Sequence, residues 1–276
     1  MSAYKNLFDT HLHTEWSGDS STPVLDQINR AKELGLSGIT ITDHMDLDFP
    51  ETPDRFKLDL PNYLSTLKKI ALQESSPDFE ILIGMELGLQ PQCVDDNHSL
   101  LRNYNFDYII GSLHLIDGMD PYYDSFYEGK SVTWCYETYF TSLLANIKQF
   151  SDFDSLGHMD YIARYAKRFY GEEEARLSYS MFPELFDEIF HFLIRRNISL
   201  EVNTGGMQHG LPEPNPSYEL LQRYYDLGGR MITLGADSHT TAHVGLNFPG
   251  VVSDLKKIGF KGQMIYRRRN AEFNPF

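Results

Sequence analysis

The chain has 276 residues, a hydrophobic fraction of 41% and a formal net charge of −15 at pH 7. The apolar content is sufficient for a large core and excludes a disordered chain. The acidic balance argues against a nucleic-acid binder, which would usually be basic. Two cysteines, Cys93 and Cys135, are too few for a disulfide framework. Neither a signal-peptide pattern nor an apolar run of the roughly 20 residues that span a bilayer is present, so we expect a soluble, cytoplasmic protein that does not enter membranes.

Short β-rich runs alternate with helical patterns along the chain, which favours βα units and a largely parallel sheet. The predicted strands are Leu7–Asp9, Leu36–Thr42, Glu80–Gly84, Phe106–Gly111, Phe153–Leu156, Ile198–Asn203 and Arg230–Gly235. The predicted helices are Pro23–Leu34, Pro61–Gln73, Tyr136–Phe150, Ser178–Arg195, Ser217–Leu227 and Val251–Ile258. The segment Ile116–Cys135 is expected to be an ordered active-site loop. No linker or repeat interrupts the series, so we expect one domain over residues 1–276, folded as a (β/α)7 barrel of the TIM-like α/β class.

Histidines and carboxylates follow these strands, at the point where each strand ends. Because the carboxyl ends of barrel strands gather at one mouth, we expect the side chains to meet there. Imidazole and carboxylate together suit zinc, iron or manganese, so the pattern predicts a metal site with several ions. The candidate ligands are His11, His13, Asp19, His44, Glu86, His114, His158, Asp237 and His239.

The spacing within these motifs supports shared ligation. His11 and His13 lie two residues apart, so in a strand both point to the same face. Asp237 and His239 repeat that spacing at the last predicted strand, which lies beside the first in a closed barrel. Glu86 ends an apolar strand, where a buried carboxylate is costly unless a cation neutralises it. Glu86 is therefore predicted to bridge two metals, the alternative being an exposed loop glutamate.

Two other candidates have ordinary structural alternatives. Taken alone, Asp19 is more typical of a loop or helix-start residue than of a ligand, and the alternative for His44 is a histidine held by its neighbour Asp43. Together with His239, they predict a third cation site of mixed oxygen and nitrogen character.

Taken in chain order, the motifs resemble those of the polymerase and histidinol phosphatase (PHP) superfamily over nearly the whole chain. Within it, the chain length and the segments Gly157–Tyr165 and Leu200–Thr204 are most similar to those of monofunctional histidinol-phosphate phosphatases, which remove phosphate from L-histidinol phosphate during histidine synthesis. The resemblance implies a distorted (β/α)7 barrel with three divalent metal ions, variously zinc, iron and manganese, at the carboxyl strand ends. The motifs are Asp9–Thr14, Ser17–Asp19, Thr42–His44, Gly84–Glu86, Ser112–His114, Gly157–His158 and Ala236–His239.

The resemblance also implies how the ligands divide among the metals. The first metal takes His11, His13, Glu86 and Asp237; the second takes Glu86, His114 and His158; the third takes Asp19, His44 and His239. Many relatives have a histidine where this chain has Asp19, which affects the affinity and metal preference of the third site.

The hypothetical mechanism is hydrolysis by a metal-activated hydroxide, with His44 or Asp19 assisting the leaving alkoxide. Arg164 resembles the arginine that holds phosphate in the family, and a guanidinium fork matches phosphate geometry; a surface salt bridge is its alternative. Relatives place a second arginine soon after the position of Thr204, whereas this chain has Gly205 and Gln208 in that segment. Tyr122, Tyr123 and Tyr127 either close over an imidazole ring or serve as packing residues.

We therefore predict a histidinol-phosphatase that acts on a small phosphomonoester, with no nucleic-acid partner and with a homo-oligomer left open. One alternative is a PHP phosphoesterase with another small phosphomonoester or nucleotide as substrate. A second, less favoured alternative is a catalytically silent metal-binding PHP module.

Overall fold

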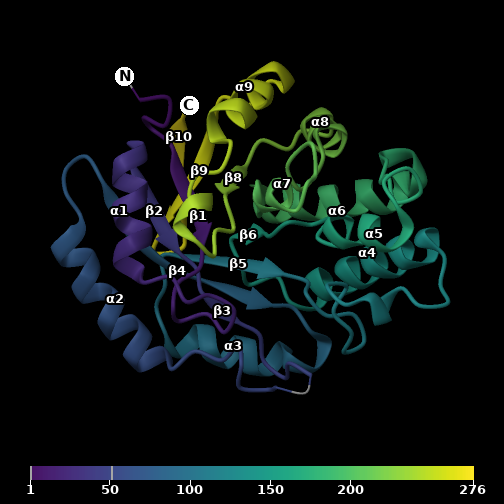
Figure 1. Cartoon of the computed structure of the whole chain (residues 1–276), viewed down its shortest axis with the longest axis horizontal. Helices are drawn as coiled ribbons and strands as arrows, with labels where there is room; N and C mark the ends of the chain where they lie inside the picture. The colour runs from purple at the N-terminus through teal and green to yellow at the C-terminus, as the bar shows by residue number, and fades with distance from the viewer. Residues whose placement is uncertain (1, 51) are drawn as a thin grey trace.

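Seven parallel strands form a nearly closed barrel in the computed structural model, which describes residues 2–50 and 52–276 (Figure 1). Between the last strand and the first, the backbone N–H of Asp237 donates to the carbonyl of His11 (2.7 Å) and that of His13 to Ser238 (2.9 Å). The predicted (β/α)7 class is therefore confirmed. In barrel order the strands are β1 (Phe8–Leu12), β2 (Gly38–Ile41), β4 (Glu80–Gly88), β5 (Tyr108–Ser112), β6 (Ser155–Leu156), β7 (Ser199–Asn203) and β8 (Ile232–Gly235).

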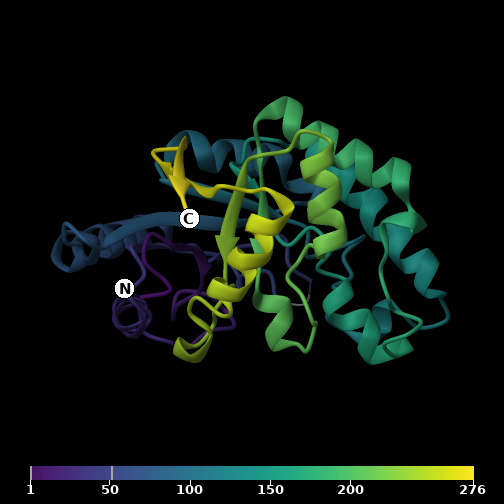
Figure 2. The same cartoon turned by 90° about the horizontal axis from the view of Figure 1, so that it is seen from above.

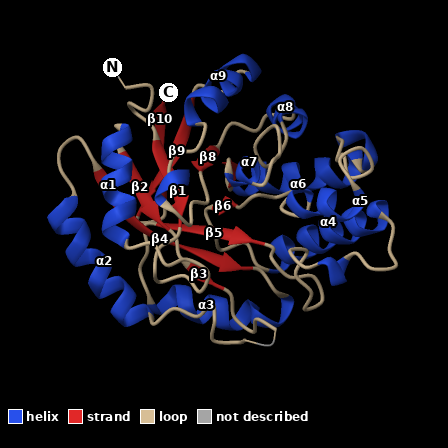
Figure 3. Cartoon of the chain, viewed as in Figure 1, coloured by secondary structure: helices blue, strands red, loops and turns tan. Residues whose placement is uncertain are grey.

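Helices surround the strands, with α1 and α2 on one side of the barrel and α4, α5 and α6 on the opposite side (Figures 1 and 3; Figure 2 gives the perpendicular view). Helix α1 ends at Gly35, whose φ of 80° is the left-handed geometry that favours glycine. The helices are α1 (Val24–Leu34), α2 (Leu60–Glu74), α3 (Val94–Asn103), α4 (Val132–Gln149), α5 (Ala163–Tyr170), α6 (Pro183–Arg196), α7 (Gly205–Gln208), α8 (Tyr218–Asp226) and α9 (Phe248–Ile258).

Several helix predictions differ from the structure. The chain forms α3 and α5, which the sequence pattern did not predict, because α3 buries only two of its residues and α5 buries a charged one, Arg164. Helix α4 begins four residues earlier than expected, where the Ser131 hydroxyl accepts a hydrogen bond from the N–H of Trp134. Helix α6 begins at Pro183 rather than Ser178, because proline favours the first helical turn.

Strand β4 extends beyond its predicted end and carries Glu86 inside the sheet. On one side it pairs with the short strand β3 (His44–Met45), where His44 lies opposite Glu86, and on the other side it pairs with β5. Glu86 is therefore held by strand pairing on both sides rather than by a loop.

A hairpin of two strands, also not predicted, covers the end of the barrel opposite the predicted metal ligands. In this hairpin β9 (Gly262–Arg267) pairs with β10 (Asn270–Pro275). Ile265 packs against Phe8 and Leu82, which lie in the first halves of their strands, while Tyr266 stacks on Tyr108 at 5.2 Å between ring centroids. Strand β10 is largely exposed and lacks an alternating apolar pattern, which explains why the sequence did not indicate it.

Within the described residues, no helix combines the length and apolarity that crossing a membrane requires. Cys93 and Cys135 are both buried and form no disulfide.

Candidate metal centre

The carboxylate of Glu86 lies at the centre of the predicted ligands and is fully buried. Its Oε1 faces Nε2 of His158 at 2.9 Å and Nε2 of His114 at 3.2 Å. Its Oε2 faces Nε2 of His11 at 3.2 Å and Nδ1 of His44 at 3.0 Å. The two oxygens of one carboxylate therefore face two separate groups of imidazoles, which is the arrangement that a bridging ligand requires.

The first group joins the end of β1 to the segment after β8. Nε2 of His11 and Nε2 of His13 lie 3.1 Å apart, as expected for residues on one face of a strand. Oδ1 of Asp237 lies 3.2 Å from Nε2 of His13 and 3.7 Å from Nε2 of His11. Asp237 adopts a φ of 54°, a left-handed conformation that aspartate tolerates better than most residues.

The second group joins β4, the residues after β5 and the residues after β6. Glu86, His114 and His158 each offer one ligand atom, and these atoms lie within 4.8 Å of one another. The same criterion places His11, His13 and Asp237 together, so both groups of the sequence prediction are close in space.

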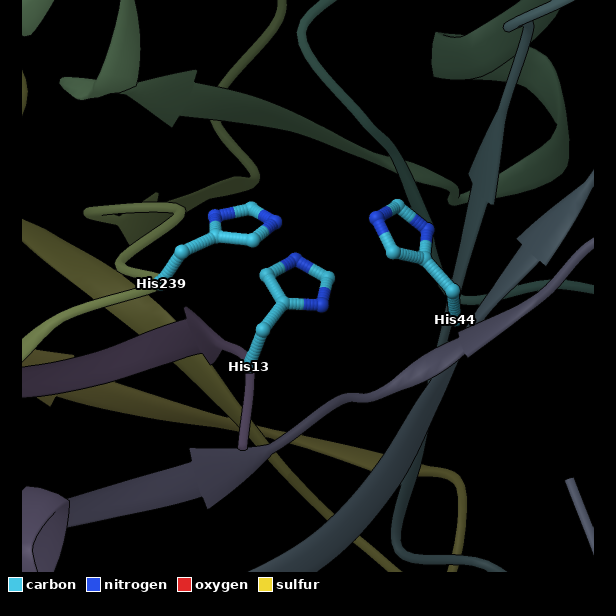
Figure 4. A group of neighbouring side chains, drawn as sticks. All are labelled: His13, His44 and His239. Carbon is cyan, nitrogen blue, oxygen red and sulfur yellow. The ribbon is translucent and has the colours of Figure 1, made fainter. Parts of the chain in front are cut away.

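The third group is more open to solvent. Oδ2 of Asp19 lies 3.1 Å from Nε2 of His239 and 3.5 Å from Nε2 of His44. The ring of His13 stacks against His44 and against His239, each at 4.2 Å between centroids. Figure 4 shows the rings of His13 at the end of β1, His44 in β3 and His239 in the loop after β8, turned toward a common space.

Two further acidic residues that we did not predict contact this cluster. Oδ1 of Asp46 lies 2.7 Å from Nδ1 of His114, and Oε1 of Glu201 lies 2.6 Å from Nδ1 of His11. The sequence held a signal for each. Asp46 follows His44 at the two-residue spacing that places both on one strand face, and Glu201 interrupts the apolar strand β7 as Glu86 interrupts β4.

The electrostatics of the cluster give two of its members, Glu86 and His13, the protonation states of metal ligands. Around them, carboxylates outweigh the effect of burial and raise the pKa values of His11, His44 and His114. Burial alone would raise the pKa of the Glu86 carboxyl, but the imidazoles of His11, His44 and His114 hold that pKa well below its ordinary value. Burial lowers the pKa of His13 to about 3, helped by the nearby imidazoles of His239 and His44. The central carboxylate is thus ionised and His13 is neutral, as metal ligation requires.

Several donor atoms of the cluster lack a hydrogen-bond partner, which also fits the binding of divalent cations. Among the described residues, buried atoms that lack a hydrogen-bond partner include Oε2 of Glu86, Nδ1 of His44 and Oδ2 of Asp46. Leaving such atoms unpaired is costly, and a cation between them removes the cost. The cluster contains imidazole and carboxylate and no sulfur, a donor set that suits zinc, iron and manganese. It is therefore a metal-binding site.

Arg164 lies in α5 at the edge of the cluster and is buried. Its guanidinium donates to Oδ2 of Asp237 (2.7 Å), Oδ1 of Asn203 (2.7 Å) and Oδ1 of Asn215 (3.0 Å). Because a guanidinium has five N–H donors, donors remain for an anion in the adjoining cavity, which Arg164 helps to line. The surface salt bridge considered as its alternative is wrong.

A cavity of about 610 Å³ opens above the cluster. Tyr122 and Tyr123 line it, whereas Tyr127 is fully buried and packs against Phe126 and Tyr170. The segment that lacks the expected arginine forms the short helix α7, and its Gln208 also lines the cavity. His209 and His243, which do not stand directly at the end of a predicted strand, line it too, because they lie in the segments after β7 and β8.

The barrel with this ligand cluster at its carboxyl mouth defines the class of the protein, a metal-binding TIM-like barrel enzyme. Residues 9–205 match the model of the PHP domain. The chain belongs to the PHP family, which confirms the resemblance of its motifs.

Comparisons with individual proteins agree. The chain is 33% identical over 262 residues to a "probable histidinol-phosphatase" of Clostridium acetobutylicum, covering 95% of this chain and 98% of that protein. It is 30% identical over 254 residues to the histidinol-phosphatase of Lactococcus lactis, covering 91% of each. A crystal structure of histidinol phosphate phosphatase from Lactococcus lactis, complexed with zinc, L-histidinol and phosphate, superposes with a TM-score of 0.85 at 26% identity and covers 97% of this chain and 99% of that chain.

Proposed function

We propose that this chain is a metal-dependent histidinol-phosphatase, which hydrolyses L-histidinol phosphate to L-histidinol and phosphate. The observation that carries the proposal is the position of Glu86, whose two oxygens face separate imidazole groups at the mouth of a barrel. The likeness to the Lactococcus lactis enzyme, whose structure holds zinc, L-histidinol and phosphate, supports this substrate.

We assign the nine predicted ligands to three divalent cations of zinc, iron or manganese. Two neighbouring divalent cations would lower the pKa of a water molecule that both bind, and they would neutralise charge on the phosphoryl oxygens. The chain contributes the ligands at fixed positions: His11, His13, Glu86 and Asp237 for one cation, Glu86, His114 and His158 for a second, and Asp19, His44 and His239 for a third.

Two residues are assigned to the leaving alkoxide, which needs a proton. Burial alone would raise the pKa of Asp19, but the imidazole of His44 and the hydrogen bond to His239 hold that pKa far below its ordinary value. Asp19 is then ionised and cannot donate a proton itself. Because an imidazole nitrogen bound to a cation has no proton to give, we assign the proton to His44 only when the third site holds no cation, and we give Asp19 the role of orienting it.

Arg164 is assigned to the phosphate group of the substrate, because its guanidinium is fixed by three acceptors and borders the cavity. Lysine offers one nitrogen in place of the three that donate to these acceptors, so Arg164→Lys would lose the fixed orientation of the cation, and we expect weaker inhibition by the product phosphate. We expect Arg196→Lys, on the outer helix α6, to leave phosphate inhibition unchanged.

The decisive experiment purifies the protein without added metal, determines its metal content and measures phosphate release from L-histidinol phosphate. We expect bound divalent metal, turnover that chelation abolishes, and loss of turnover in His11→Ala and Glu86→Ala. His191→Ala, on α6 and outside the cluster, is the matched control.

A second candidate, a PHP phosphoesterase with a different small phosphomonoester, is favoured by one observation. The segment after Thr204 offers Gln208 and His209 to the cavity in place of an arginine. Turnover of other phosphomonoesters without L-histidinol phosphate hydrolysis would establish this candidate, and metal content without any turnover would establish a silent module.

As a biosynthetic enzyme with two free thiols, the protein is assigned to the cytoplasm.

A further inference from the structure

One carboxylate in the cavity lacks a cationic partner. The carboxylates that line the cavity are those of Asp19, Asp46, Asp120 and Asp237. Asp19 and Asp46 face imidazole nitrogens and Asp237 faces the Arg164 guanidinium. Within the described part of the chain, no lysine, arginine or histidine forms an ion pair with Asp120. The negative charge of Asp120 is therefore available to a cation from solution.

Among the described residues, the hydrogen-bond donors to the Asp120 carboxylate are neutral. Its Oδ1 accepts hydrogen bonds from the backbone N–H of Tyr122 at 2.8 Å and from the hydroxyl of Tyr161 at 3.3 Å. Burial raises the pKa of the carboxyl to about 6, which the N–H of Tyr122 and the more distant His114 only partly oppose. A partly buried carboxylate without a countercharge is costly, and a cationic ligand would offset that cost.

The wall around Asp120 is aromatic. The ring of Tyr161 lies 5.1 Å from that of Tyr165, and the ring of Tyr165 lies 5.3 Å from that of Tyr122. Aromatic faces attract cations, so this wall adds to the attraction that the carboxylate provides. The guanidinium of Arg168 already lies 5.6 Å from the Tyr122 ring, but its charge is paired with Asp124.

Asp120 lies a short distance from the metal ligands. The ring that contacts it, Tyr161, is 5.2 Å from the ring of His158 and 5.5 Å from that of His114. A single side chain, that of Tyr161, therefore contacts both Asp120 and the second ligand group. In L-histidinol phosphate the ammonium is on the carbon next to the one that carries the phosphate ester, so it too must lie close to the reacting phosphorus.

We propose that Asp120 binds the ammonium group of the substrate and restricts this phosphatase to phosphate monoesters of amino alcohols. This inference rests on the proposed function and names a specificity determinant within the same cavity.

The test compares two esters that differ only in the amino group, L-histidinol phosphate and 3-(imidazol-4-yl)propyl phosphate. Asp120→Asn keeps an oxygen that can accept from Tyr122 and Tyr161 but removes the charge. We expect KM for L-histidinol phosphate to rise about 10-fold or more, in line with the loss of a charged hydrogen bond, while KM for the des-amino ester stays unchanged. Asp117→Asn is the matched control, because Asp117 is an exposed aspartate of the same loop whose φ of 50° suits asparagine.

The possible outcomes separate this inference from the proposed function. Equal losses on both esters would assign Asp120 a general structural or proton-transfer role and would overturn the inference, as would no loss at all. If the wild-type protein does not hydrolyse L-histidinol phosphate, the proposed function fails, and the same variants are then compared on 2-aminoethyl phosphate and ethyl phosphate. A preference for the amino ester that Asp120→Asn abolishes would retain the ammonium site, and equal rates on the two esters would reject it.

Discussion

Glu201 accepts a 2.6 Å hydrogen bond from Nδ1 of His11 and so leaves Nε2 of that ring free to face the other ligands. The second oxygen of Glu201 accepts the backbone N–H of His158 at 2.8 Å and the side-chain amide of Asn203 at 3.0 Å. One buried carboxylate therefore positions a residue from each of the two ligand groups that Glu86 joins. Outer carboxylates of this kind fix the tautomer and orientation of a ligating imidazole.

Replacing Glu201 by glutamine should weaken metal binding without removing a ligand. We expect a loss of about 10–100-fold in metal affinity or activity, the range typical of such outer partners. The measurements are metal content after dialysis and kcat at saturating metal. Glu128→Gln, an exposed residue outside the cluster, should match the wild type. A Glu201→Gln protein with wild-type metal affinity and kcat would show that Glu201 does not position His11.

Gly235 permits the close approach of Glu201 and His11. A Cβ added at Gly235 would overlap Oε1 of Glu201 and Cβ of His11. Because both neighbours are fully buried, Gly235→Ala should displace them, and we expect metal loss together with a lower melting temperature. Gly250→Ala in α9 is the control, since an added Cβ there meets nothing within 4 Å. Full metal occupancy in Gly235→Ala would contradict the expectation.

Cation binding should release protons. In the metal-free protein burial lowers the pKa of His114, but the carboxylates of Asp46 and Glu86 outweigh this effect and raise it from 6.5 to about 10. A cation at Nε2 must displace that proton, so apparent metal affinity should rise with pH up to about pH 10. Calorimetric zinc titrations in buffers of different ionisation enthalpy measure the protons released.

The raised pKa also has a consequence for stability. Because the folded pKa of His114 exceeds its ordinary value, protonated His114 stabilises the metal-free fold most below pH 6.5, and this contribution is lost as the pH rises through about 10. Asp46→Asn should reduce both this dependence and the proton release near pH 8. A variant that releases as many protons as the wild type would show that Asp46 does not raise the pKa of His114.

The hairpin at the opposite end of the barrel should affect stability and not turnover. The hydroxyl of Tyr266 donates to the carbonyl of Asp154 at 2.9 Å and lies 2.8 Å from the hydroxyl of Ser199. Tyr266→Phe should lower the free energy of unfolding by about 1–3 kcal/mol, the range for a buried polar group left unpaired. Denaturant unfolding measures the loss, and kcat on L-histidinol phosphate should stay at the wild-type value. A reduced kcat would mean that the two ends of the barrel are coupled.

The sequence indicated the barrel and the gathering of the predicted ligands at one end, because both depend on local order along the chain. Strand runs alternate with helices, and His11, His114 and Asp237 each occur where a strand ends. In a parallel barrel the carboxyl ends of the strands lie together, so the order of the elements was enough to predict that these residues meet.

Asp46, Glu201 and Asp120 depend on contacts that the sequence order does not contain. Asp46 meets His114 because the two-residue strand β3 pairs with β4, and Glu201 meets His11 across the barrel. The lack of a cationic partner for Asp120 is visible only in the structure, which shows the partner of each other carboxylate that lines the cavity. The hairpin of β9 and β10 was missed for a similar reason, since its stability comes from Phe8, Leu82 and Tyr108 at distant positions.

The hairpin also determines where the two ends of the described chain lie. The side chain of Asn274 donates to the carbonyl of Asn6, so the segments that hold the termini meet at the closed end of the barrel, as Figure 1 shows. Either terminus can therefore carry a tag, a fusion partner or a link to a solid support without obstructing the substrate entrance. Joining the two termini and opening the chain in an exposed outer loop would give a circular permutant with its entrance unchanged.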